Sequence, residues 1–173
     1  SAQPAKKADT VSSKALRGAM LSATDLSDSD TAEQLIQLAE AGKLNTVIVN
    51  IKDDEGELNI PVETDMVSDV EDLQAKKAEK LAQNMRELSK NGVHVIGRIY
   101  CFQDEAASKQ NSDLSMEYQN GGRWSDYNSE HWLDPTNPDV VTYLCDIAQS
   151  AVDAGCDEIL LDEFTFPLRG HID

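Results

Sequence analysis

Basic residues are scarce in this sequence of 173 residues, and their scarcity limits the kind of partner that the protein can bind. There are 15 lysine and arginine residues against 32 aspartate and glutamate residues, which gives a formal net charge of −17 at pH 7. Nucleic acids and anionic membranes are bound by basic surfaces, so we predict neither as a partner. The charge suits a neutral or cationic ligand, or simply a well-solvated surface.

Long apolar runs and paired cysteines are also missing. No stretch approaches the roughly 20 apolar residues of a membrane-spanning helix, so we predict no membrane span. The three cysteines, Cys101, Cys145 and Cys156, are odd in number and do not have the spacing of a zinc site. Because Cys101 falls in a strand pattern and Cys145 on a helix face, we expect small buried hydrophobic residues. We predict no cofactor and no metal.

The first 14 residues contain no starting methionine and no hydrophobic periodicity. They are mostly small and polar, as in a linker or in a segment left after a signal or anchor has been removed. We therefore expect residues 1–14 to be a flexible linker or processed terminus, and residues 15–173 to form the domain. Such a start is compatible with an extracellular or cell-surface location in a bacterium.

Four apolar stretches with the pattern of β-strands alternate with helical patterns. The strands are predicted over residues 15–21, 46–52 and 93–102 and within residues 157–167. Helical spacing and cap residues predict helices over residues 30–42, 70–92 and 137–155, and leave residues 103–135 irregular. Strands and helices that alternate at these distances form a parallel sheet of βαβ units, so we predict the α/β class.

The predicted helices have specific cap and core residues. Asp30 is expected as the N-cap of the first helix, and Asn137 with Pro138 as the start of the last. The core face of the long middle helix is expected to consist of Ala78, Leu81, Met85 and Leu88. The face of the last helix is expected to consist of Val141, Leu144, Cys145, Ala148 and Val152.

Charged residues gather where the predicted strands end, and in parallel sheets of this kind the chemistry takes place at the carboxyl ends of the strands. Alternation along a strand puts Asp162 on one face, with Arg98 and Lys52 on matching faces of the other strands. We expect Arg98 and Lys52 to be interior cations close to Asp162, which would keep its carboxylate ionised. Tyr100 shares the face of Arg98, and Asp53 lies just beyond Lys52.

One acid, two bases and a tyrosine at strand ends suit a polyhydroxylated ligand, but each also has a plainer interpretation. Arg98 and Asp162 can form a purely structural ion pair, and Lys52 with Asp53 can simply begin a charged loop. Glu163, a candidate substrate-binding residue, points the other way along the strand from Asp162 and can be a solvated residue of the rim.

Aromatic residues are absent from the first 99 positions, and all nine lie between Tyr100 and Phe166. Trp124, Tyr127 and Trp132 fall in the irregular stretch that follows the third strand. This clustering near strand ends predicts a stacking platform for a flat ligand face, and sugars have such faces. The alternative is a loop with a small core of its own.

Five motifs follow one another in an order that resembles a known family. They read "RGAML", "LNTVIVNIKDDEGEL", "NGVHVIGRIYCFQD", "WLDPTNP" and "DEILLDEFTFP". From Leu16 to Pro167 the chain is similar to a family of bacterial candidate glycoside hydrolases with (β/α)8-barrel domains, which are often exported. The resemblance implies half of a TIM-type barrel, a hydrolase that acts on an oligo- or polysaccharide, and carbohydrate as the partner.

The resemblance also implies which residues form the site. The motifs match acidic and basic positions of the family at Lys52, Asp53, Arg98, Asp134 and Asp162. Related barrel hydrolases carry a catalytic carboxylate at the end of the fourth strand, which is the position of Asp162. Thr165 stands where the family has an arginine, so a role that rests on that arginine has no counterpart here. Tyr100, Asp134, Glu163 and the loop aromatics are then the expected substrate-binding residues.

Four predicted strands are fewer than a complete barrel contains, because eight strand–helix units need about 250 residues. Glycoside hydrolysis needs two carboxylates, and in the related enzymes the general acid follows on a later strand. We therefore expect an amino-terminal half-barrel that is inactive alone, with Asp162 as nucleophile or electrostatic stabiliser. Its open apolar face and two strand edges are expected to be covered by the missing half or by a second copy, as a homodimer.

Two other functions stay open at this point. The first is a non-catalytic carbohydrate-binding or assembly module at a cell surface. The second is a small doubly wound α/β domain of unrelated function that is complete in itself.

Overall fold

Four parallel strands form one sheet in the order β1–β2–β3–β4 in the computed structural model, which describes residues 15–68, 72–167 and 170. The strands are β1 (Gly18–Leu21), β2 (Thr46–Lys52), β3 (His94–Tyr100) and β4 (Glu158–Asp162). Because the spatial order follows the chain order, every crossover moves the chain one strand along, as in a barrel wall. The predicted α/β class with four parallel strands is confirmed. The predicted linker, 1–14, lies outside the described residues.

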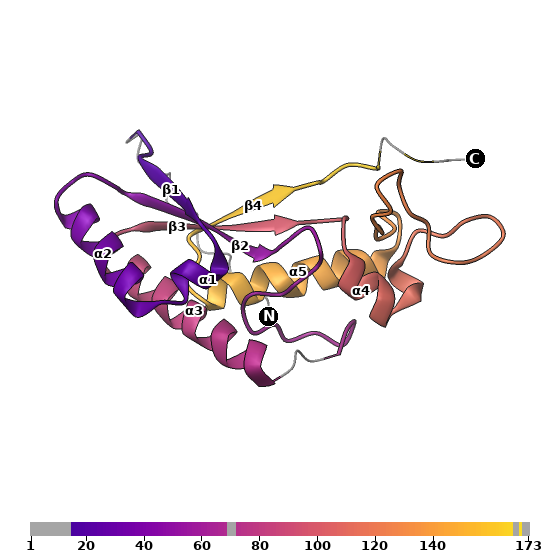
Figure 1. The fold of residues 1–173 in the computed structure, drawn as a ribbon, viewed down its shortest axis with the longest axis horizontal. Coiled ribbons are helices and arrows are strands. Elements are labelled where there is room, and N and C mark those ends of the chain that lie inside the picture. The colour runs from indigo at the N-terminus through magenta and orange to yellow at the C-terminus, as the bar shows by residue number, and fades with distance from the viewer. Residues whose placement is uncertain (1–14, 69–71, 168–169, 171–173) are drawn as a thin grey trace, which may run out of the picture.

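Helices cover one side of this sheet. They are α1 (Ala23–Leu26), α2 (Ser29–Glu40), α3 (Asp72–Lys90), α4 (Glu105–Gln110), the 3₁₀ helix η1 (Ser112–Leu114) and α5 (Pro138–Asp153). Figure 1 shows α2, α3 and α5 on the same side, with the opposite side of the sheet facing away from them. Within the described ranges, no helix is both long enough and apolar enough to cross a bilayer.

Side-chain caps fix where the helices begin. Asn137 accepts a hydrogen bond from the backbone N–H of Asp139 at 2.9 Å and caps α5, as predicted. The N-cap of α2 is Asp28 rather than Asp30, and its carboxylate accepts from the N–H of Asp30. The short helix α1, capped by Ser22, was not predicted, because its four residues are too few to show a helical period.

The core lies between the sheet and the helices. In α3 the predicted face is confirmed, since Leu81, Met85 and Leu88 are fully buried. They pack with strand residues that point to the helices and are also fully buried: Val47, Val49, Ile51, Val95 and Ile99. Each such aliphatic side chain contributes roughly 1.5–3 kcal/mol to folding through burial.

The face that α5 buries differs from the prediction by one helical position. The buried residues are Val140, Tyr143, Ile147 and Ala151. Val141 and Val152 are each 53% exposed and Cys145 is exposed, so these three predicted core positions were wrong. The apolar arc of α5 is wider than the face that the sheet covers, and spacing alone cannot select the covered part.

Burial raises the pKa values of the other two thiols, Cys101 to about 11 and Cys156 to about 12.

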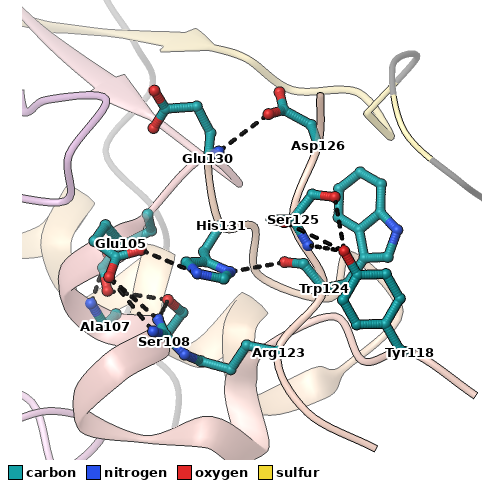
Figure 2. A network of polar contacts seen from close by, with 11 residues as sticks. Glu105, Ala107, Ser108, Tyr118, Arg123, Trp124, Ser125, Asp126, Glu130 and His131 are labelled. Carbon is teal, nitrogen blue, oxygen red and sulfur yellow. Dashed lines mark hydrogen bonds and ion pairs between the residues drawn. The ribbon is translucent and has the colours of Figure 1, made fainter. Parts of the chain in front are cut away.

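The predicted irregular stretch, 103–135, is an ordered extension beyond the carboxyl ends of the strands (Figure 1). Isolated antiparallel bridges join Gln103 to Trp132 and Ser115 to Leu133. Polar contacts hold its outer part, as Figure 2 shows: His131 Nδ1 lies 2.9 Å from the backbone oxygen of Trp124, and its Nε2 lies 3.7 Å from Glu105 Oε2.

Gly97, at the centre of β3, lies where the core leaves no room for a side chain. A Cβ atom there would lie 2.6 Å from Cys156 Sγ and 2.8 Å from Ile51 Cγ1. We predict that Gly97→Ala lowers the free energy of unfolding by about 1–3 kcal/mol through overpacking, as measured by urea denaturation.

The matched control for this prediction is Gly18→Ala in β1, where the added Cβ would meet Thr46 at an ordinary 3.4 Å. The control is expected to keep full stability. Adding Cys156→Ala to Gly97→Ala should restore part of the loss, and equal stability of all three variants would contradict the packing.

Candidate active site

The side of the sheet that faces away from the helices carries the candidate site at its carboxyl end. The strand register places Asn50 beside Arg98, Arg98 beside Leu160, and Tyr100 beside Asp162. Neighbouring residues of parallel strands point to the same face, so these side chains share the open face. On β2 and β3 the alternate residues, such as Val49 and Ile99, point to the helices and are fully buried.

Asp162 and Arg98 form the centre of this site. Arg98 Nε donates a hydrogen bond to Asp162 Oδ2 at 2.8 Å, and Nη2 donates to the same oxygen. The backbone N–H of Glu163 donates to Oδ1 at 2.9 Å. Hydrogen bonds from Arg98, and next from this N–H, lower the pKa of Asp162 below its usual value. The side chain is 38% exposed, so it is an ionised carboxylate that a ligand can reach.

Tyr100 completes the cluster. The guanidinium carbon of Arg98 lies 4.3 Å from the centre of the Tyr100 ring, a cation–π contact that fixes the plane of the guanidinium. Desolvation raises the pKa of Tyr100; Arg98 opposes this shift, and Asp54, Asp162 and Glu163 add to it. These three carboxylates therefore lie within electrostatic reach of one phenol.

Two features of the site, one in the backbone and one in a side chain, were not predicted from the sequence. Glu163 has a φ of 46°, in the left-handed region that residues other than glycine rarely adopt. Such strain is often found at functional positions. On the open face, the buried Oδ1 of Asn50 accepts no hydrogen bond from the described residues. A buried acceptor without a donor costs free energy, so this oxygen is an unusual feature of the open face.

Lys52 is not part of this cluster, which corrects the prediction that it lies close to Asp162. A β-bulge between Asn50 and Lys52 shifts the register, so Lys52 lies beside Ile99 rather than sharing the face of Arg98. The extra residue turns Lys52 toward the helices. A bulge leaves no clear signal in the sequence pattern of β2, and strict alternation therefore assigned Lys52 to the wrong face.

Lys52 is instead the cation of a fully buried ion pair. Its Nζ lies 3.0 Å from Asp104 Oδ2, and both side chains are 0% exposed. Nζ also donates to the backbone oxygens of Tyr100 and Gln103. The other carboxylate oxygen of Asp104 accepts from the N–H of Ala107 and caps α4. Lys52 thus joins the ends of β2 and β3 to α4, which is a structural role.

Asp53 and Asp134 stabilise turns. Asp53 Oδ1 accepts from the backbone N–H groups of Glu55 and Glu57, and burial raises the pKa of this carboxyl group. Asp134 Oδ1 accepts from the N–H and the hydroxyl of Thr136, at 2.8 and 2.7 Å, just before α5. These contacts match the turn-forming role of aspartate, and they place neither residue in contact with Asp162.

The three loop aromatics do not form one exposed platform. Trp124 and Trp132 are 3% and 6% exposed and belong to the hydrophobic core, whereas Tyr127 is 67% exposed. Other aromatic rings lie nearer to Asp162 along the chain. Phe164 stacks on Phe102 with ring centres 5.4 Å apart and remains 59% exposed. Phe166 is 52% exposed as well, and the sequence offered "DEFTFP" as the signal for both rings.

A cleft lies on another part of the surface. It is a cleft of about 1020 Å³ between the segment 55–58 and α4, and Glu55, Glu57, Glu105 and Glu130 line it together with Lys109. Among the described residues, no three or more histidine, cysteine, aspartate or glutamate side chains are grouped so that they could hold a metal ion. The cleft contains neither Asp162 nor Arg98.

Comparison with known proteins gives a family match and a fold match. A family model with the description "Putative glycosyl hydrolase domain" matches residues 18–173. The crystal structure of a hypothetical protein from Ruminiclostridium thermocellum is 32% identical with a TM-score of 0.69, and the alignment covers 88% of this chain and 78% of that one. The two chains are therefore similar in length. No curated protein matches the sequence.

More distant solved structures show the fold. An α-amylase from Lactobacillus plantarum has a TM-score of 0.60 at 8% identity over 85% of this chain. The Flavobacterium johnsoniae chitobiase has a TM-score of 0.55 at 18% identity over 86% of this chain. This chain spans 38% of the amylase chain and 24% of the chitobiase chain. The sheet thus corresponds to part of a (β/α)8 barrel.

We predict that the two cation–carboxylate pairs differ in their effect on stability. Lys52→Met leaves Asp104 charged and fully buried, so it should lower the free energy of unfolding by about 3–5 kcal/mol. Arg98→Ala affects a pair whose side chains are 21% and 38% exposed, and should cost less than about 1 kcal/mol. Chemical denaturation measures both. Adding Asp104→Asn to Lys52→Met should recover part of the loss, and an equal cost for the two single variants would contradict the assignment.

A second prediction concerns the pKa of Asp162. Arg98→Gln removes the main group that lowers it, so the pKa should rise toward the ordinary value of about 3.9 in a carboxyl-carbon NMR titration. Because the folded-state pKa is lowered, the pair stabilises the fold above the unfolded-state pKa, and this contribution is lost as the pH falls through the folded-state pKa. An unchanged pKa in the variant would show that Arg98 does not hold the carboxylate.

Proposed function

The chain belongs to the glycosyl hydrolase domain family whose model it matches, and from this we propose that its open-face cluster is the carbohydrate site of a glycoside hydrolase. Asp162 is the catalytic carboxylate in this proposal. It acts as nucleophile, or as the negative charge that stabilises an oxocarbenium-like transition state. Arg98 and Tyr100 are positioning residues that hold the carboxylate in one orientation.

The observation that carries the proposal is the state of Asp162 at the carboxyl end of β4. An attacking or stabilising carboxylate must be ionised, oriented and accessible. Arg98 and the N–H of Glu163 provide the first two properties, and the exposed fraction of 38% provides the third. A purely structural pair would satisfy the orientation without leaving the carboxylate open to a ligand.

Nearby groups suit the other needs of a sugar ligand. Asn50 shares the open face with Arg98, so polar side chains from two neighbouring strands lie on this face. The exposed ring of Phe164, held by its stack on Phe102, offers a flat apolar surface just after β4. Sugars combine hydroxyl groups with apolar ring faces, and such sites pair hydrogen-bonding groups with aromatic rings.

Hydrolysis also needs a protonated acid on the other side of the glycosidic bond. Arg98 lowers the pKa of Asp162, so Asp162 is ionised and cannot be the protonated acid. The pKa of Asp53 is raised, but its Oδ1 is engaged with two backbone N–H groups. The general acid is therefore assigned to none of the described residues. We expect the chain alone to bind neutral oligosaccharides weakly and to hydrolyse none.

The test is a binding titration of maltohexaose and chitohexaose, followed by calorimetry, with the product of each glycan assayed in parallel. Asp162→Asn keeps the shape of the side chain and removes its charge. It should weaken binding about tenfold, because hydrogen bonds to charged groups contribute about 1.5–3 kcal/mol. The matched control is Asp30→Asn, an exposed residue in the first turn of α2, which should leave binding unchanged.

Two results would contradict the proposal. Equal affinities of Asp162→Asn and the unchanged chain would remove Asp162 from the carbohydrate site. Turnover of either glycan that Asp162→Asn abolishes would keep the site but would show that the chain contains its own general acid.

A further inference from the structure

The segment that follows β4 packs against other parts of the chain at more than one point. Its described residues are 163–167 and Gly170, and we call them the strap. Near its start, Phe164 stacks on Phe102, with ring centres 5.4 Å apart. Pro167, three residues later, is buried. The strap is therefore held to the body of the protein on both sides of its exposed part.

Gly170 of the strap lies against the indole ring of Trp124. A Cβ atom at Gly170 would lie 2.1 Å from Cζ2 and 2.7 Å from Cη2 of Trp124, so the ring leaves no room for a side chain there. The φ of Gly170, 147°, is also one that residues with a Cβ atom rarely adopt. Glycine is therefore the residue that this contact requires.

Trp124 is itself fixed through its backbone. Its N–H donates to the backbone oxygen of Met116 at 2.7 Å. Its backbone oxygen lies 2.9 Å from His131 Nδ1, as Figure 2 shows. His131 and Arg123 both face Glu105 of α4, with Nε2 and Nη1 at 3.7 and 3.4 Å from its carboxylate oxygens. These contacts tie the backbone of Trp124 to α4, and the ring of Trp124 in turn meets the strap.

The first residue of the strap, Glu163, contributes to the candidate site through its backbone. Its N–H donates to Asp162 Oδ1 at 2.9 Å, so Arg98 holds one oxygen of the carboxylate and the strap holds the other. Glu163 presents this N–H with a φ of 46°, a left-handed conformation that is unfavourable for a residue with a Cβ atom. Such a conformation persists only where the surrounding structure holds it.

We propose that Trp124 and Gly170 are positioning residues for Asp162. Their contact holds the strap so that the N–H of Glu163 points to the carboxylate and the ring of Phe164 stays in place for a ligand. The extension after β3 thus controls the geometry of the site through the strap. The link from Trp124 to Asp162 stands on the contacts alone, whereas its importance for a carbohydrate rests on the proposed function.

The first experiment breaks the contact with Gly170→Ala and follows Glu163 and Asp162 by NMR. We expect faster hydrogen exchange of the Glu163 amide, because the strap no longer holds it on its acceptor. Arg98 is the main group that lowers the pKa of Asp162, and the N–H of Glu163 is the second. The pKa of Asp162 should therefore rise in Gly170→Ala, but by less than in Arg98→Gln. A role of Gly170 in packing alone would change neither measurement.

The matched control is Gly121→Ala in the extension after β3. Gly121 also has a positive φ, 86°, but a Cβ atom there would have no described residue within 4 Å apart from its chain neighbours. This control adds backbone strain without displacing the strap, so both NMR measurements should stay unchanged. A second variant, Trp124→Leu, removes the ring and should act in the same direction as Gly170→Ala. The double variant should exceed neither single variant, because both break one contact.

The second experiment measures the affinity for chitohexaose and maltohexaose. Gly170→Ala should weaken binding about two- to tenfold, because a released Phe164 must be ordered again when the ligand binds. Gly121→Ala should bind as the unchanged chain does. If the unchanged chain bound neither glycan, the proposed function would fail, and the NMR measurements would still decide whether the strap holds Asp162.

Two results would overturn the proposal. The first is an Asp162 pKa and a Glu163 exchange rate that Gly170→Ala leaves unchanged; Trp124→Leu serves as the second witness where circular dichroism shows it to be folded. The second is a change in both NMR measurements with no loss of affinity in a chain that binds glycans, because the contact would then not position the site for its ligand.

Discussion

The buried ion pair between Lys52 and Asp104 is the interaction on which the site end of the structure depends. It has two fully buried partners, and it joins the end of β2 to the segment after β3 and to the first turn of α4. A buried lysine is tolerated only with such complete compensation, here a carboxylate and two carbonyl oxygens. The β-bulge that delivers Lys52 to this position also removes it from the open face.

That displacement simplifies the electrostatics of the candidate site. With Lys52 neutralised by Asp104, Arg98 is the cation that contacts Asp162, while Asp54 and Glu163 lie close enough to Tyr100 to influence its pKa. The site is therefore an ionised carboxylate on a single guanidinium, within an acidic rim. This arrangement fits a ligand without negative charge, and it connects the composition of the chain to the chemistry of one strand end.

The sequence predicted those features that follow from local periodicity and capping. Residues 46–52 form β2 with the predicted bounds, Asn137 caps α5, and Leu81 and Met85 of α3 are core residues. It also predicted the contact between Arg98 and Asp162, because strict alternation holds in β3 and β4. The predictions failed where a shift of one residue changes which face a side chain occupies. The bulge before Lys52 moved it to the helix side of the sheet. In α5 the apolar arc is wide, and Tyr143 is buried whereas Val141 is exposed.

The aromatic residues show a different limit. Clustering in the sequence predicted a surface platform, but Trp124 and Trp132 fill the core of the extension after β3, and only a packed structure separates these outcomes. Phe164 and Phe166 belong to the last sequence motif, but the motif did not predict that their rings are exposed. Their exposure depends on how the chain leaves β4 at Glu163. A site on the open face therefore relies on the strand ends more than on the loop.

The most direct test of the central claim is a map of backbone amide shifts during titration with a neutral oligosaccharide. The account predicts that the largest changes occur at Arg98, Asp162, Glu163 and Phe164, on the open face at the carboxyl end of the sheet. The cleft between the segment 55–58 and α4 provides a clear contrast. Changes confined to Glu55, Glu105 and Lys109, with none at Asp162, would contradict the assignment.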